Sequence, residues 1–269
     1  MCYSKEVQLI TALVILISAL AYYLYFSNKF KESKWRKQFL KISMIGVACI
    51  GLHQFFEFLS LTTENRLVYK IGLIISVCAV YFLLRSLEIL SNKKIHSKLA
   101  LIPIALVSIQ ILISDMNFTE ASFYLKHNSA FFWAAVWMFL FIYWHICAFK
   151  AYSEVKDDYS KKTVLIYLLA IADISFILSA IYVLFGYFFL GLNVCTDAPS
   201  IWCTFYAIEA LLIPFLMFRM GEKFKRINKL RRLKIKQTLL YLALSLLILI
   251  LFFLMPPMFR CLTWKFVFP

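Results

Sequence analysis

Apolar residues along the chain fall into blocks that are separated by short polar connections. Most blocks hold about twenty residues, and a helix of that length crosses a hydrocarbon core of about 30 Å. No polar stretch is long enough to form a soluble domain. The pattern therefore predicts an all-α, polytopic transmembrane helix bundle that forms a single integral membrane domain. The expected spans lie at about 7–26, 39–61, 67–90, 99–114, 129–149, 163–190, 200–218 and 237–255.

Composition and charge placement agree with this pattern. Hydrophobic residues make up 63% of the chain and charged residues 16%, whereas about a quarter of the residues in a soluble domain are charged. Lys and Arg cluster in the first, third, fifth and seventh connections, which the positive-inside rule assigns to the cytoplasmic side. Both termini are then expected outside, and eight spans are favoured over the alternative of seven. The net charge of +15 points to topology rather than nucleic acid, because no soluble basic module carries it.

The cysteines divide by expected position. Cys49, Cys78 and Cys147 lie inside predicted spans and are expected to be packing residues. Four others lie near the expected outer face, which is the oxidising side, where they either form disulfides or stay unpaired. Cys195–Cys203 is the first candidate for a disulfide because its loop is short. The four outer cysteines are Cys2, Cys195, Cys203 and Cys261.

Several polar residues fall deep inside the predicted spans, where an ionisable group is costly and often functional. At 1.5 Å per helical residue, four of them lie roughly 15–18 Å from the nearest basic residue on the inner side. Glu57 lies one turn beyond His53 on the same helix face. We expect a polar site that binds a small molecule or an ion, the alternative being separate hydrogen bonds between helices. Its expected residues are His53, Gln54, Glu57, Gln110, Asp173 and Glu209.

The sequence leaves open whether these buried polar residues are catalytic, bind a metal ion or do neither. His53 is a candidate general base that Glu57 would orient, so these two are the catalytic candidates. His53, Glu57 and Glu209 are candidate metal ligands, although one imidazole with carboxylates is unlike most zinc sites. His145 lies only roughly 8 Å deep and is expected to be an interfacial histidine. No cofactor is predicted, and the sequence does not give an oligomeric state.

Short motifs give a faint resemblance. The opening Met1-Cys2-Tyr3-Ser4 resembles a family of uncharacterised bacterial multi-pass membrane proteins that begin Met-Cys-Phe/Tyr-Ser. That family has a Gln/His-Gln-x-x-Glu element in its second span. His53-Gln54-Phe55-Phe56-Glu57 is similar with a spacing that differs by one residue, and Pro199-Ser200-Ile201-Trp202-Cys203 is a third point of likeness. The resemblance implies a bacterial inner (plasma) membrane location and a site in the outer half shared by Cys2 and the His53 turn.

Three classes of function fit these features. The first is a small-molecule, ion or proton-linked transporter, because polar groups at one level come from several helices. The second is an intramembrane enzyme, either lipid-directed or metal-dependent. The third is a membrane sensor or assembly subunit that acts through partners. The lipid bilayer is the one partner that the sequence predicts directly.

Overall fold

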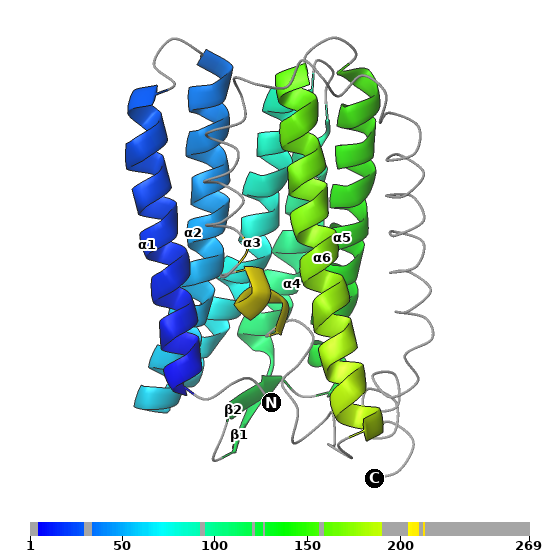
Figure 1. The fold of residues 1–269 in the computed structure, drawn as a ribbon. Helices are drawn as coiled ribbons and strands as arrows, with labels where there is room; N and C mark the ends of the chain where they lie inside the picture. Colours follow the sequence, from blue (N-terminus) through cyan, green and yellow to red (C-terminus); the bar gives the residue numbers. More distant parts are fainter. Residues whose placement is uncertain are drawn as a thin grey trace. The chain divides into compact units, whose positions relative to one another are not determined.

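The structure is a computed structural model that describes residues 5–29, 34–91, 95–119, 122–125, 127–155, 159–189, 204–209 and 212. Contacts divide the chain into two compact units, Tyr3–Leu165 and a second unit of Met1–Cys2 with Ile166–Pro269. Figure 1 shows the elements. They are α1 (Lys5–Lys29), α2 (Lys34–Thr63), α3 (Arg66–Leu90), η1 (Ser97–Ala100), α4 (Leu101–Ile113), β1 (Met116–Thr119), β2 (Ser122–Leu125), α5 (His127–Glu154) and α6 (Tyr159–Phe189).

Long apolar helices confirm an all-α, multi-pass membrane protein. Among the described residues, five helices are long and apolar enough to span a bilayer. They correspond to the predicted spans at 7–26, 39–61, 67–90, 129–149 and 163–190. Of the predicted span at 200–218, a helical segment at 204–209 and residue 212 are described, and the span at 237–255 lies outside the described residues. The five helical stretches are Lys5–Ser27, Lys34–Thr63, Arg66–Leu90, Ala135–Glu154 and Lys161–Tyr182.

The fourth predicted span differs from the other five. The apolar helix there, Ser97–Ile113, begins with the 3-10 turn η1 and is shorter than a full span. It ends at Ser114, and the chain continues into an antiparallel hairpin in which Met116 pairs with Leu125. This hairpin was not predicted from the sequence. Figure 1 places it at the same end of the first unit as the turn between α2 and α3.

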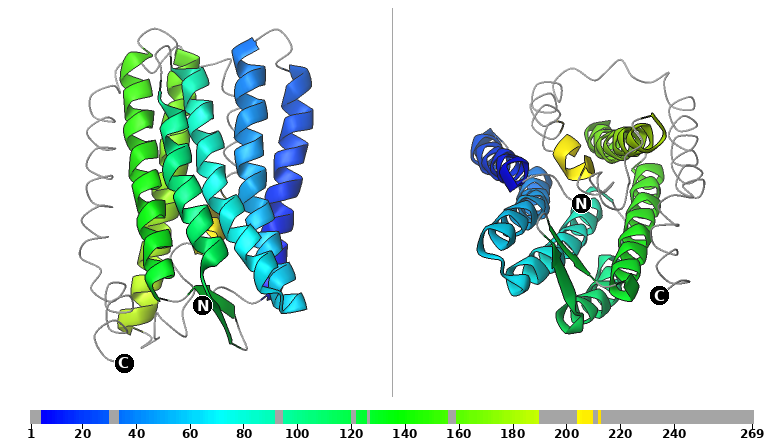
Figure 2. Two further views of the ribbon diagram at one scale, coloured as in Figure 1. Left: turned by 180° about the vertical axis from the view of Figure 1, so that it is seen from behind. Right: turned by 90° about the horizontal axis from the view of Figure 1, so that it is seen from below.

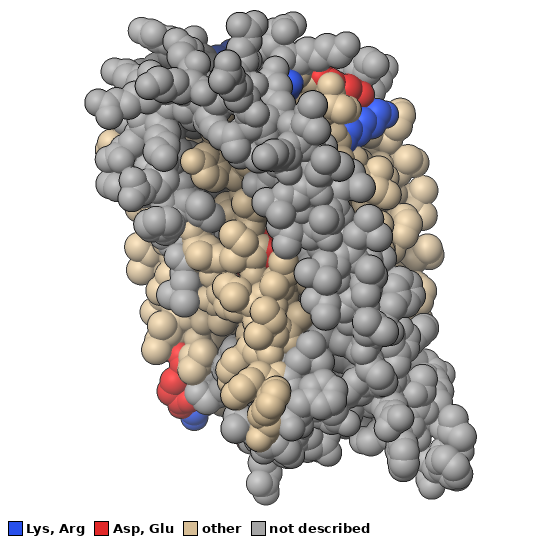
Figure 3. Space-filling model, turned by 45° about the vertical axis from the view of Figure 1, so that its right-hand side comes forward, with Lys and Arg blue, Asp and Glu red and all other residues tan. Residues whose placement is uncertain are grey.

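Lipid-facing positions are apparent from exposure. Large apolar side chains such as Ile10, Ile17 and Leu20 are exposed on α1, whereas Ala12 and Ile15 are buried. This inverted pattern is expected where lipid takes the place of water. On the face drawn in Figure 3, the described charged atoms lie mainly near the two ends, and the described atoms between them are nearly all uncharged.

Glycines bring neighbouring helices of the first unit close together. A Cβ on Gly51 would lie 2.9 Å from Cγ of Leu16 on α1, and one on Gly46 would lie 3.2 Å from Cδ2 of Leu83 on α3. Small residues at such points let helix backbones approach, which favours association in lipid. Each of α1, α2 and α3 packs on the next in sequence, and α3 also packs on α4 and α5, as the end-on view in Figure 2 shows.

A two-residue turn joins α2 to α3. Glu64 has a positive φ of 54°, and the backbone N–H of Asn65 donates to the Ser60 carbonyl at 3.1 Å. This is the Schellman ending of a helix, in which the left-handed position usually holds glycine. The Asn65 side chain then caps α3 by accepting from the N–H groups of Leu67 and Val68. The turn therefore fixes the antiparallel register of α2 and α3.

At the opposite end of α3, polar side chains tie three elements together. Arg85 forms an ion pair with Glu88, as the spacing of three residues predicts. Glu88 also accepts from the backbone N–H of Ser97 at 3.0 Å, which anchors the start of η1. Ser91 donates to Glu154 of α5 at 2.8 Å. This end of the unit is thus held by hydrogen bonds as well as by apolar packing.

Candidate functional site

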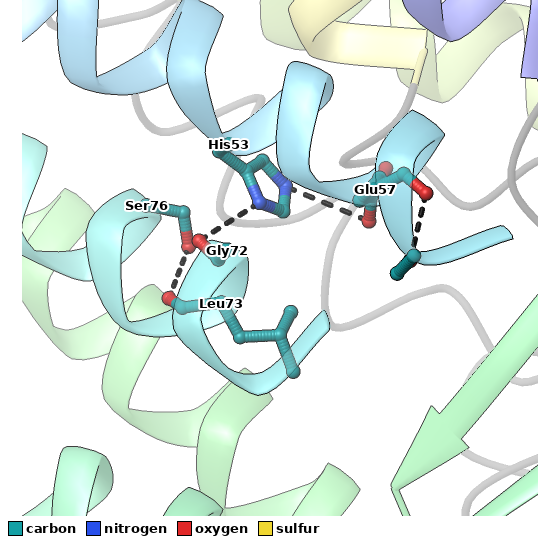
Figure 4. A network of polar contacts seen from close by, with 6 residues as sticks. His53, Glu57, Gly72, Leu73 and Ser76 are labelled. Carbon is teal, nitrogen blue, oxygen red and sulfur yellow. Dashed lines mark hydrogen bonds and ion pairs between the residues drawn. The ribbon is translucent and has the colours of Figure 1, made fainter. Parts of the chain in front are cut away.

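His53 and Glu57 lie together in the interior of the first unit. They project from successive turns of α2, and their relative exposures are 3% and 2%. His53 Nε2 lies 3.7 Å from Glu57 Oε1, which is within ion-pair range and longer than a hydrogen bond. Figure 4 shows both side chains and the neighbouring part of α3. The structure therefore brings together the two residues that the i, i+4 spacing selected.

The other ring nitrogen of His53 faces α3. Nδ1 lies 3.0 Å from the backbone carbonyl oxygen of Gly72, and Figure 4 draws this contact. A carbonyl oxygen only accepts hydrogen bonds, so Nδ1 must carry the proton and donate it. Nε2 is then the nitrogen that gains or loses a proton, and it is the one that faces Glu57. The backbone of α3 thereby fixes the histidine tautomer.

Gly72 is needed for this contact because α2 and α3 nearly touch there. A Cβ at position 72 would lie 3.0 Å from Cβ of Phe56, and 3.7 Å from Nδ1 of His53. A Cβ contact of 3.0 Å is tighter than most contacts in proteins, so a side chain here would have to displace its neighbours by a few tenths of an ångström. The glycine therefore sets the spacing at which His53 reaches the carbonyl.

Tyr69 is the third side chain of the site, and the sequence analysis missed it. Its hydroxyl group and the Glu57 side chain form a hydrogen bond. Tyr69 follows the α2–α3 turn and Glu57 precedes it, so the antiparallel register brings the two side chains within reach of each other. Locating the turn at Glu64 and Asn65 in the sequence would have been the signal. A chain of polar groups thus runs from the Gly72 carbonyl through His53 and Glu57 to Tyr69.

More polar side chains are buried on the same half of the first unit. Gln54 lies beside the pair on α2 with 2% relative exposure. On α1, Gln8 and Thr11 are also buried. Because the antiparallel helices α1 and α2 touch at Leu16 and Gly51, residues before Leu16 run alongside residues after Gly51. Gln8 and Thr11 were not selected by the sequence analysis, because neutral polar residues near the start of a span look interfacial.

Burial restricts the protonation states of the His53–Glu57 pair. Two protons would leave a buried positive charge, and none would leave a buried negative charge. Each of these states is costly in a medium of low dielectric constant. One proton gives either two neutral groups or an ion pair, and both are neutral overall. Burial therefore favours a single proton on the pair, held by either Nε2 or the carboxyl group.

The remaining candidate residues lie elsewhere. Gln110 is half-buried on α4, which packs against α3 and α5. Asp173 and Glu209 are buried and belong to the second unit, so their common level with His53 stays a prediction. His145 lies on α5, and its Nδ1 bonds the carbonyl of Phe141 within the same helix at 2.9 Å.

Metal and thiol chemistry has limited support among the described residues. Within them, no group of three or more His, Cys, Asp and Glu side chains could hold a metal ion. Cys49, Cys78 and Cys147 are free thiols in α2, α3 and α5. The four cysteines expected outside, including the candidate pair Cys195–Cys203, lie outside the part of the chain that the structure describes.

Comparison of the chain with protein-family models, curated proteins and solved structures finds no match. The site itself is therefore the basis for a functional assignment.

Proposed function

We propose that this protein is a proton-linked carrier of a small molecule or ion, and that His53 and Glu57 hold the coupling proton. One observation carries the proposal. The buried side chains of His53 and Glu57 face each other, with 3.7 Å between Nε2 and Oε1. Because Nδ1 of His53 contacts the Gly72 carbonyl, Nε2 is the ring nitrogen that remains able to titrate. Buried proton-sharing groups inside membrane helices are typical of proton relays in transporters.

The same geometry argues against His53 as a general base. A catalytic histidine is oriented through one nitrogen and presents the other to the substrate. Here Nδ1 faces the Gly72 carbonyl and Nε2 faces Glu57, so both nitrogens are directed at protein groups. An intramembrane enzyme is therefore the weaker proposal.

The proposal includes an arrangement in the bacterial inner membrane. Eight spans with both termini outside would put the basic first, third, fifth and seventh connections in the cytoplasm. The packing of α1, α2 and α3 supports this, because it gathers Lys34 and Lys37 at the same end as Arg85. Gln54, which is buried next to His53 on α2, is the residue that we propose to contact the transported solute.

A pH jump on proteoliposomes tests the carrier without knowledge of its solute. Vesicles of full-length protein adsorbed on a solid-supported membrane receive a rapid change in external pH. A proton that enters a buried site moves charge across part of the membrane field. We expect a transient current for the wild type and its loss in His53→Gln and in Glu57→Gln.

His145→Gln is the matched control, because this histidine lies on α5 and bonds a carbonyl of its own helix, whereas the proposed proton site lies on α2 and α3. Its current should equal that of the wild type. The proposal fails if the wild type gives no current, or if all three variants respond like the wild type.

A further inference from the structure

The polar chain of the site ends at Tyr69, and its position relative to the membrane surface differs from that of its partners. Tyr69 is half-buried, whereas His53 and Glu57 are buried. It lies one turn into α3, and Glu57 lies six residues, or roughly 9 Å, before the end of α2. His53 is one turn deeper. Of the three side chains, Tyr69 is therefore the most exposed, and it lies nearest the end that holds the α2–α3 turn.

In the opposite direction, the buried hydroxyl of Ser76 on α3 donates to the Leu73 carbonyl of its own helix at 2.7 Å. The buried face of α2 holds no chain of polar groups there. The buried side chains that follow His53 toward the start of α2 are apolar until Ser43, which is roughly 15 Å away along the axis. Protons move along hydrogen-bonding groups or water, and a close-packed apolar face supplies neither. The intervening buried side chains are Ile50, Val47 and Met44.

The Tyr69 hydroxyl is a hydrogen-bond partner of Glu57 on α3. Lys70, the next residue, donates from Nζ to the Leu112 carbonyl at 2.8 Å and so points to α4. On α1, which packs against α2, the buried polar residues are Gln8 and Thr11, and neither of them titrates in water. The other charged residues at this end are exposed, namely Lys5, Glu6, Glu64 and Arg66.

We infer that Tyr69 is the relay through which the His53–Glu57 site exchanges its proton with the membrane face at the α2–α3 turn. This inference rests on the proposed function and adds the direction of proton access. The hydroxyl passes a proton by donating its own to Glu57 while accepting another on its oxygen, so no net charge stays on Tyr69. Tyr69 is a positioning residue as well, because its hydrogen bond holds the Glu57 carboxyl in place.

Infrared difference spectroscopy tests the relay on full-length protein in lipid nanodiscs. The bands of the Glu57 side chain are assigned by their loss in Glu57→Gln, and their response to transfer into D2O is followed in time. Tyr69→Phe keeps the ring and removes the hydroxyl. We expect the Glu57 bands to shift and their response to slow roughly tenfold, the usual scale for one hydrogen bond.

Tyr81→Phe is the control, because Tyr81 lies on the same helix and contacts the ring of Phe82 at 5.5 Å. It should leave both the band positions and the rate unchanged. Unchanged bands in Tyr69→Phe overturn the inference, and so do shifted bands with an unchanged rate. Wild-type protein that shows the Tyr69-dependent rate but no pH-jump current contradicts the carrier and keeps the relay. A pH-jump current together with a rate that does not depend on Tyr69 contradicts the relay alone.

Discussion

Nδ1 of His53 lies 3.0 Å from the carbonyl oxygen of Gly72, so a backbone group on α3 determines which nitrogen of this histidine faces Glu57. The contact depends on close helix packing rather than on a second side chain. It makes the chemistry of the site sensitive to the distance between α2 and α3.

Enlarging Gly72 is the first way to change that distance. In Gly72→Ala the new methyl group would lie 3.0 Å from Cβ of Phe56, so we expect α2 and α3 to separate by a few tenths of an ångström and the His53 contact to lengthen. We expect a loss of stability of about 1–3 kcal/mol, as for other overpacked sites, together with loss of the pH-jump current. Thermal unfolding in detergent and the current measurement check the two effects.

Gly46→Ala is the matched control for this change. Gly46 lies in the same α2–α3 interface, where a methyl group would meet Leu83 and Phe82. It should also be destabilised, but it should retain the proton current because it lies two turns from His53. Equal loss of current in both variants would show that helix packing in general, and not the Gly72 carbonyl, controls the site.

Removing one member of the buried pair should cost more than its contacts suggest. His53→Gln or Glu57→Gln leaves the other group without its proton-sharing partner, and breaking such a pair typically costs about 3–5 kcal/mol. The double variant removes both groups, so its loss should be smaller than the sum of the two single losses. Free energies of unfolding in mixed micelles give this double-mutant cycle. Additive losses would mean that the two side chains act independently.

The α2–α3 turn offers two substitutions with opposite effects. Asn65→Ala removes the side chain that caps α3 and should cost about 1 kcal/mol. Glu64→Gly relieves the positive φ of 54° and should stabilise the protein by up to about 1 kcal/mol. Melting temperatures of the two variants check the signs. A destabilising Glu64→Gly would contradict the left-handed geometry of this turn.

At the other end of α3, two substitutions of Glu88 distinguish the contribution of its ion pair from that of its hydrogen bond. Glu88→Gln keeps an oxygen for the Ser97 N–H and loses the charge attraction to Arg85, whose side chain is 39% exposed. Such a pair is screened by solvent, so the loss should stay below about 1 kcal/mol. Glu88→Leu also removes the Glu88 acceptor of the Ser97 N–H, which keeps its contact to the Ile95 carbonyl at 2.9 Å, so the further cost should be about 1 kcal/mol. Equal losses in chemical unfolding would contradict the role of Glu88 as an anchor of η1.

The sequence predicted the parts of this structure that depend on one helix at a time. Block length located five of the long helices, and the i, i+4 spacing placed His53 and Glu57 on one face. Tyr69 and Gly72 could not be selected in this way, because their contacts depend on the register between α2 and α3. That register follows from the Schellman turn and from the glycine contacts, which involve pairs of helices.

There is a second reason why part of the site was not predictable, and it concerns the residues that were expected at one depth in the membrane, namely His53, Gln110, Asp173 and Glu209. Residue counting gives depth along a helix axis, but it does not give the rotation of the helix about that axis or its neighbours. Gln110 illustrates the difference, since α4 packs against α3 and α5. The short hairpin of β1 and β2 was missed because four-residue strands carry too little pattern.

Nitrogen-15 NMR of histidine-labelled protein in lipid nanodiscs tests the central claim most directly, because the chain has four histidines and His53→Gln identifies the signal of His53. The account predicts that at neutral pH Nδ1 of His53 carries a proton and Nε2 shares one with Glu57, so that Glu57→Gln shifts the Nε2 resonance and leaves Nδ1 protonated. A His53 with a bare Nδ1, or an Nε2 resonance that does not respond to Glu57→Gln, would contradict it.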